Sequence, residues 1–477
     1  MRSTGRLLVY LSLLSGISFT AMAGETAVAP DSPGTVPVNQ LDLRPRIDPP
    51  ETRSRQDLDA FELRASLRET PAGPPGLRGA LETALGRDAD WQAALMDVKV
   101  ADRQVWRELL RFTPVVTGAL ETSHSSAGDG SRPFDLVDRE SYVAISASLP
   151  LWTSGSRYYG VKAARSRRDT LAFEALAVRD QASMTLIDTW MRAVTGARDR
   201  ELHLDSIKRL KRLRGAVIAR QRAGFASSDD VAQVNADIAA ARQTLSSIEG
   251  ALAKANARLE RLAGQTPRKS AKMMRFEQHF RDGKELFIQG AHRTNPQLQA
   301  AASRYRTEIY ATRFAVSDLL PSVNLTGEYR HYLESSRRTS DDRGLTVGIR
   351  LRVPLIDLSS VAETSAQSAR REAALYREVS ALNEVEIQID ELWSDRSTTI
   401  AMRNEAEREV AARKKNAAAA LNRFQKGLGS LEDAIRAQSS LITAQRTALQ
   451  LTAQESVLAA QLLVISGRFT SDMLTGD

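Results

Sequence analysis

The chain has 477 residues and no cysteine, which excludes disulfide bonds, thiolate metal sites and a cysteine-linked lipid anchor. Its 66 Lys and Arg residues outnumber its 58 Asp and Glu residues, for a formal net charge of +8. Charges of both signs are interleaved along helical stretches, a pattern typical of solvated helix faces and not of a surface that binds nucleic acid.

The N-terminal residues 1–23 have the three parts of a secretory signal peptide. A start carrying Arg2 and Arg6 precedes an apolar run, Leu7–Phe19, that is too short to span a bilayer as a helix, and Ala21-Met22-Ala23 fits a cleavage site. We therefore expect a mature chain outside the cytoplasm. Residues 24–76 hold nine of the 16 prolines and predict an extended or disordered arm.

Sequence landmarks then recur about 205 residues apart. They are a proline, an alternating run and a glycine turn: Pro114, Tyr142–Leu149 and Gly224 in the first copy, and Pro321, Leu345–Val353 and Gly427 in the second. The constant order predicts a duplicated unit of a helix, two strands and a long helical hairpin.

We expect the two repeats to span 77–264 and 286–470. Residues 265–285 are then a linker between the repeats, and 471–477 form a C-terminal tail. Pro114 and Pro150 should bracket the first pair of strands, as Pro321 and Pro354 bracket the second.

The predicted strands have one apolar and one polar face. In Leu345–Val353 every odd position is aliphatic, whereas the even positions include Arg350 and Arg352. The other two sets of apolar positions share this phase: Val143, Ile145, Ala147 and Leu149, and Val323, Leu325, Gly327 and Tyr329. Such alternation fits a transmembrane β-barrel and a half-buried soluble sheet equally well.

Two proline-free regions predict helices of unusual length, Tyr158–Gln221 and Ser359–Lys426. Each would reach roughly 100 Å at ~1.5 Å per residue, longer than any globular core, so coiled-coil neighbours are needed. Four strands are too few to close a barrel, which needs about eight, so a barrel requires several chains. The predicted fold class is mainly α with a small β part.

The ordered set of motifs from about Leu81 to Phe469 resembles the TolC family of trimeric outer-membrane export channels. The motifs are a repeat opening, the ends of two strands and two hairpin tips: Asn295-Pro296-Gln297-Leu298 ahead of Leu319-Leu320-Pro321, with a degenerate counterpart at Asp88–Trp91; Leu149–Trp152 and Val353–Ile356; Gly224, Ser227 and Asp230; and Gly427, Ser430 and Asp433. The resemblance implies a homotrimer in which each protomer contributes four transmembrane strands to one barrel, with helices forming a periplasmic tunnel.

The resemblance also implies a function and partners. The chain would be a passive duct in the outer membrane, in contact with its lipid. It would work with a periplasmic adaptor and an inner-membrane transporter, for which we expect the ABC type. The absence of a lipid-bearing cysteine favours type I protein secretion slightly, and small-molecule efflux is the alternative. A periplasmic coiled-coil adaptor is a weaker alternative, because an adaptor would show one hairpin flanked by β-rich segments.

The hairpin tips hold the candidate site residues. Asp230 and Asp433 are either ordinary helix N-terminal carboxylates or, as the resemblance implies for Asp433, acids that line the periplasmic entrance. Arg436 stands where the family has a second acid, and it could pair with Asp433.

Two further positions depart from the family pattern. Phe424 and Gly429 replace a tyrosine and an arginine that help to tie the closed state of the resembled channel. The exposed ends at Gly224, Ser227, Gly427 and Ser430 are expected to contact the adaptor.

We expect no enzymatic activity, metal or cofactor. The five histidines are scattered without metal-ligand spacing, and the sequence contains no phosphate-binding loop or nucleophile elbow.

Overall fold

A computed structural model describes residues 76–125, 138–268, 283–335 and 343–470, together with 67, 73, 271, 273–274, 276–281 and 473. The chain divides into two compact units, Met1–Thr35 and Val36–Asp477, and all described residues lie in the second. The expected signal peptide, most of the Pro-rich arm and most of the C-terminal tail lie outside the described residues.

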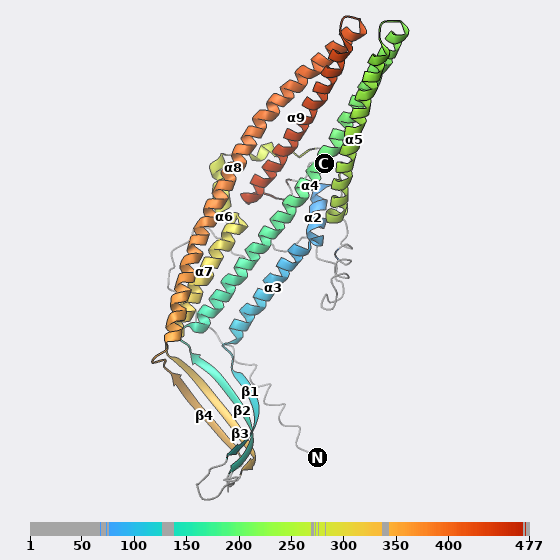
Figure 1. Cartoon of the computed structure of the whole chain (residues 1–477). Coiled ribbons are helices and arrows are strands. Elements are labelled where there is room, and N and C mark those ends of the chain that lie inside the picture. The colour runs from blue at the N-terminus through green and yellow to red at the C-terminus, as the bar shows by residue number, and fades with distance from the viewer. Residues whose placement is uncertain are drawn as a thin grey trace. The chain divides into compact units, whose positions relative to one another are not determined.

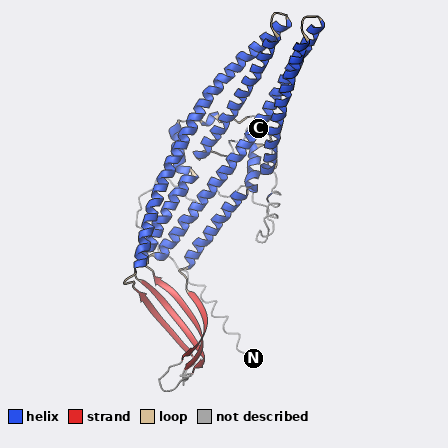
Figure 2. Ribbon diagram, viewed as in Figure 1, coloured by secondary structure: helices blue, strands red, loops and turns tan. Residues whose placement is uncertain are grey.

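Most of the described chain is helical, as predicted, and it contains one small antiparallel sheet (Figures 1 and 2). The elements up to residue 263 are α2 (Leu77–Arg87), α3 (Ala89–Leu110), β1 (Val115–Ser125), β2 (Asp138–Trp152), α4 (Ser156–Arg222) and α5 (Ser228–Ala263). The later elements are the 3-10 turn η3 (Glu277–His279), α6 (Lys284–Thr294), α7 (Pro296–Ser317), β3 (Ser322–Ser335), β4 (Arg343–Arg352), α8 (Leu358–Gln425) and α9 (Leu431–Ile465).

The two long helices form where the proline-free regions predict them. α4 has 67 residues and α8 has 68, and each packs against the shorter helix that follows it, α5 or α9. Asp357 caps the start of α8 by accepting a hydrogen bond from the Ser360 backbone N–H. Hydrogen bonds from Ser359 and then Ser360 lower the pKa of this carboxyl group to about 2.

The sheet has the strand order β1-β2-β3-β4, with all neighbours antiparallel. Its register confirms the predicted faces, because Leu149 lies opposite Leu325, which in turn lies opposite Ile349. The apolar face is uncovered, and Ile349 is 70% exposed. On the polar face, charged side chains pair with one another, and Arg330, for example, donates a hydrogen bond to Glu328.

The second strand runs past Pro150, the proline that was expected to bracket it, and ends within the motif Leu149–Trp152. β2 does not stop before Pro150 but continues to Trp152, and its register against β3 shifts between these two residues. Proline has no N–H to donate to the neighbouring strand, so an interior strand accommodates it at an irregularity in the ladder.

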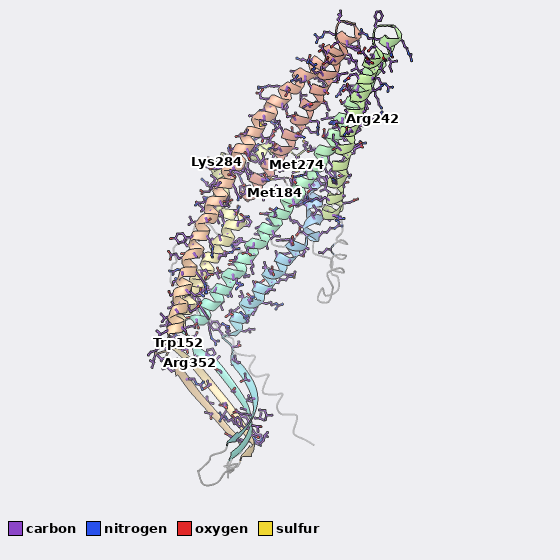
Figure 3. All side chains as sticks on the ribbon, in the orientation of Figure 1. Trp152, Met184, Arg242, Met274, Lys284 and Arg352 are labelled. Atoms are coloured by element: carbon purple, nitrogen blue, oxygen red, sulfur yellow. The ribbon has the colours of Figure 1, made fainter. Side chains whose placement is uncertain are left out.

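The main core lies where the helices of the two halves meet the segment between them. Phe280 stacks on Phe287 at 5.1 Å between ring centroids, and Phe287 meets Trp393 of α8 edge-on at 5.4 Å. Met184 and Met274, labelled in Figure 3, pack against the same core. Within the described residues, α9 is the one helix long and apolar enough to cross a membrane, but its Leu462 and Leu463 side chains are buried in this core.

Candidate functional site: the hairpin tips

The two hairpin tips have the same local structure. Gly224 and Gly427 both adopt φ of 79°, a left-handed conformation that glycine reaches without a Cβ penalty. In each tip the glycine N–H donates to the carbonyl three residues earlier, and the next residue donates to the carbonyl five residues before itself. This is the Schellman arrangement, which satisfies carbonyl groups at the helix end, so each glycine terminates its long helix.

Serine starts the returning helix at both tips. The Ser227 hydroxyl accepts from the Asp230 N–H, and the Asp230 carboxylate accepts from the Ser227 N–H at 2.7 Å, forming a capping box. Ser430 accepts from the Asp433 N–H at 3.0 Å in the same way. Asp230 therefore has a structural role, whereas no hydrogen bond or ion pair within the described residues engages the Asp433 carboxylate.

Arg436 does not pair with Asp433, the partner that their spacing led us to consider. Its guanidinium donates to Glu432, four residues earlier on the exposed surface of α9. The two acids at this helix start are consequently unequal, because Glu432 is neutralised by a neighbour and Asp433 is not.

Phe424 is buried, with 5% of its surface exposed, and does not form an exposed ring at the tip. It belongs to a cluster drawn from all four hairpin helices, here called the tip cluster: Leu210, Leu213, Val217, Val234, Ile238, Phe424 and Ala434. The tip cluster packs the two hairpins against each other just behind their turns, since its members come from α4, α5, α8 and α9.

Arg220 joins the two hairpins directly. Its Nη1 donates to the Phe424 carbonyl oxygen at 2.6 Å, and its guanidinium carbon lies 4.9 Å from the centre of the Phe424 ring. The carbonyl is at the C-terminal end of α8, where a cation also interacts favourably with the helix dipole. Arg220 was not singled out from the sequence, although its place two positions before the end of α4 matches that of Arg423 in α8.

Two more arginines connect α4 to α9 further from the tips. Arg209 donates to the Gln438 side chain at 3.0 Å, and its partial burial lowers the pKa of its guanidinium. Arg446 donates to both carboxylate oxygens of Asp199 at 3.1 and 3.2 Å. With Arg220, they form a series of polar contacts between the hairpins.

Gly429 lies where its neighbours leave little room for a side chain. A Cβ built there would lie 3.1 Å from the Arg423 Cβ and 3.4 Å from the Phe424 nitrogen. At this position, where the resembled family has an arginine, the backbone of the second tip therefore lies too close to Arg423 and Phe424 to leave free space for a side chain.

The outermost apolar side chains are exposed. Phe225 and Leu428 each follow a tip glycine and are 75% and 77% exposed. The expected contact residues Gly224, Ser227, Gly427 and Ser430 surround them and are exposed as well. Each tip thus presents one large apolar side chain among small polar ones, a feature that the paired positions of Phe225 and Leu428 after the glycines could have revealed.

The described residues include no group of three or more His, Asp or Glu side chains arranged to hold a metal ion. His203 lies against Asp199, and His292 lies 2.8 Å from Glu386. The arrangement at the tips can therefore hold helices together, present a carboxylate and offer a small apolar surface.

Comparisons with known proteins agree with this architecture. The model of the outer membrane efflux protein family matches residues 80–265 and 287–468. Protein CyaE of Bordetella pertussis is 25% identical over 350 residues, covering 71% of this chain and 73% of CyaE.

Two solved structures share the fold. The outer-membrane channel OprN superposes with a TM-score of 0.73 at 17% identity, covering 94% of this chain and 99% of OprN. The outer membrane protein VceC of Vibrio cholerae superposes with a TM-score of 0.70 at 18% identity, covering 82% and 96%. The family match spans most of both halves of the chain, and the chain belongs to the outer membrane efflux protein family, whose fold is that of TolC-type channels.

Proposed function

We propose that this protein is the outer-membrane component of a tripartite export system, a passive trimeric duct without catalytic activity. The observation that carries the proposal is that one chain exposes two kinds of surface, one suited to lipid and one suited to water. A sheet with an uncovered apolar face, including Leu345 at 72% and Ile349 at 70% exposure, continues into helices with solvated faces. Lipid around the sheet and water around the helices satisfy both.

A closed ring of several protomers accounts for the unsatisfied edges. β1 and β4 are the edge strands of the sheet. The backbone N–H and C=O groups along an open edge can pair with a strand of another chain. The helices that adjoin these edges carry exposed apolar side chains on α3, namely Met96, Val100, Trp106 and Leu110, and on α8, namely Leu375, Tyr376, Val379 and Leu382. A head-to-tail contact of the β1 and α3 edge with the β4 and α8 edge closes into a ring, and three protomers provide enough strands for a barrel.

The tips are the proposed contact with a periplasmic adaptor. They lie at the far end of the long hairpins from the sheet (Figure 1), so they face the periplasm if the sheet is in the outer membrane. Phe225 and Leu428 supply the apolar anchors, and Ser227 and Ser430 lie beside them. An inner-membrane transporter, of ABC type in our preferred assignment, would complete the system.

Type I protein secretion is our preferred cargo pathway, and small-molecule efflux is the alternative. The preference rests on the cysteine-free sequence, which offers no residue for the lipid anchor of the lipoprotein efflux channels.

Crosslinking in cells tests this function. Cysteines at Ser227 and Ser430, in a chain that has none of its own, should crosslink to cysteines on the helical tip of an adaptor. The same protein should appear in outer-membrane fractions as trimers that dissociate on heating. Recovery only as a soluble periplasmic protein would refute the duct, and intact export without a crosslink from either position would refute the tip contact.

A further inference from the structure

The two returning helices of the hairpins differ in charge. α5 carries exposed charged residues along its length, including Arg242, which is labelled in Figure 3. Between Ala437 and Ile465, α9 has only two charged residues, Arg446 and Glu455, and both are engaged in ion pairs with other helices. From Ala437 to Ile465, the surface that α9 leaves exposed is consequently polar and carries no unpaired charge.

A line of hydroxyl and amide side chains follows one face of α9, at intervals of three or four residues. Its members are all exposed: Ser439, Thr443, Thr447, Gln450 and Gln454. We call this line the amide stripe. Three or four residues make one helical turn, so these side chains lie above one another over ~22 Å.

The opposite face of α9 is covered. The Ser456 hydroxyl donates to the Met274 carbonyl of the segment between the repeats at 2.6 Å, and Ala459, Ala460 and Leu463 are buried against that segment's core. Gln454 and Ser456 are two residues apart and point about 200° apart on a helix. The inter-repeat segment and the amide stripe therefore lie on opposite sides of α9.

The stripe ends in a cavity of about 420 Å³ between α4 and α9. Gln450 and Gln454 line one wall, Thr195 lines the other, and Met191, Leu449 and Leu458 supply apolar surface. No hydrogen bond within the described part of the chain engages the two amide groups, and the Thr195 hydroxyl is buried without a partner. These groups offer donors and acceptors to whatever enters.

The charges in this cavity are already paired. Asp188 binds Arg192 at 2.8 Å, and Asp199 binds Arg446 at 3.1 Å. An ionic solute would find no uncompensated charge to bind here, whereas a neutral chain of amide groups would find both donors and acceptors. The adjoining cavity of about 600 Å³ is more acidic, because Glu391 and Asp395 join Asp188 on its wall, so the neutral region ends there.

We propose that the amide stripe and the α4/α9 cavity form a contact site for an extended, unfolded segment of polypeptide. The Thr443 and Thr447 hydroxyls donate to the carbonyls four residues earlier in α9, so they offer acceptors, whereas the glutamine amides offer both donors and acceptors. The repeating carbonyl and N–H groups of an extended backbone match such a row whatever side chains the cargo carries. Over ~22 Å the stripe can accompany about seven residues of extended chain at ~3.3 Å each. The inference rests on the proposed duct and assigns its lumen to the side of α9 away from the inter-repeat segment.

Photocrosslinking tests the proposal on the purified full-length protein. A benzophenone amino acid replaces Gln454 or, as the control, Gln243, an exposed glutamine of α5 outside the cavity. The probe is a long fluorescent peptide of Gly, Ser, Thr and Asn, which is unfolded and uncharged. We expect labelling from position 454 to exceed labelling from position 243 several-fold, and Gln450→Ala to reduce it several-fold while Gln243→Ala leaves it unchanged.

Equal labelling from the two positions would overturn the proposal. So would displacement of the probe by tetraphenylphosphonium at concentrations where unlabelled peptide does not compete, because the cavity would then be a site for small organic cations. Conductance of the same preparation in planar bilayers distinguishes a failure of the proposed peptide site from a failure of the proposed duct. Conducting channels without preferential labelling refute the peptide site alone, and an absence of conducting trimers refutes the duct itself.

Discussion

At the scale of single residues, we propose that Arg220 replaces the hydrogen bonds between hairpins that Phe424 and Gly429 cannot make. Phe424 has no hydroxyl and Gly429 has no side chain, so neither can donate the side-chain hydrogen bonds that tie the closed state in the resembled channels. Arg220 instead donates to the main chain at position 424 and lies over the Phe424 ring. A contact to a backbone carbonyl does not depend on which side chain the residue carries, so it tolerates the replacement of tyrosine by phenylalanine.

Arg220→Ala should loosen the two hairpins at their tips. The lost charged hydrogen bond and ring contact are together worth about 1–3 kcal/mol. We expect a higher open probability in planar bilayers, with Arg220→Lys intermediate because lysine keeps the charge but not the planar guanidinium. Arg222→Ala, two residues on and exposed, is the matched control. Unchanged gating in Arg220→Ala would show that the tip cluster alone holds the hairpins together.

The unpaired carboxylate of Asp433 should dominate ion selectivity at the entrance. Asp433→Asn is expected to shift the reversal potential under a salt gradient toward anions. Arg436→Gln should shift it toward cations, because it releases the Glu432 carboxylate from its ion pair. Both shifts should grow below 0.1 M salt, where the screening length exceeds about 10 Å. Two variants indistinguishable from the unsubstituted channel would place these residues away from the ion path.

At the scale of elements, each strand presents a different surface on its two sides. Ile349 lies in a row of apolar side chains that crosses β2, β3 and β4, and Arg350 points to the opposite, polar face. Ile349→Arg should cost about 2–4 kcal/mol near the middle of a bilayer and reduce assembly in the outer membrane. Arg350→Ser should leave assembly intact. Equal yields of trimers that dissociate on heating from both variants would mean that the strand does not face lipid.

The contact between α8, α9 and the inter-repeat segment depends on one carboxylate. Glu455 is 6% exposed and binds Arg403 and Arg396, while Arg403 also reaches Glu277. Glu455→Ala leaves two largely buried guanidinium groups without their shared partner and should destabilise the protein by about 3 kcal/mol or more.

The measurement is urea unfolding of the detergent-solubilised protein, with Glu277→Ala as the control. That residue is exposed and makes a single ion pair with Arg403, so its loss should cost about 1 kcal/mol or less. Similar unfolding midpoints for the two variants would contradict the assigned importance of Glu455.

At the scale of the whole molecule, we propose that the exposed edges of the sheet and of the adjoining helices form the contact between protomers. Val379 is 50% exposed on α8 and lies among the apolar side chains that we assign to the contact between protomers. Val379→Asp should prevent trimer formation, since a charge buried without a partner is costly, whereas Val379→Ala should permit it. Size-exclusion chromatography with light scattering measures the outcome. Trimer formation by Val379→Asp would show that other residues form the contact between protomers.

The local periodicity of the sequence determined the elements and their faces. The proline-free regions predicted helices at Tyr158–Gln221 and Ser359–Lys426, and α4 and α8 begin and end within two residues of these bounds. The alternating aliphatic positions predicted the faces of β2, β3 and β4. Both signals are local, because a helix or a strand face depends on neighbours within a few positions.

Only the tertiary structure decided which distant residues meet. Arg220 and Phe424 are 204 positions apart, and Asp199 and Arg446 are 247 apart, so no spacing in the sequence relates them. The irregularity that keeps Pro150 inside β2 depends on the pairing with β3. Arg436 pairs with Glu432 and not with Asp433, the one partner that the sequence had suggested. Such contacts follow from how helices pack and strands align, which is set by the sum of many side chains and not by any single motif.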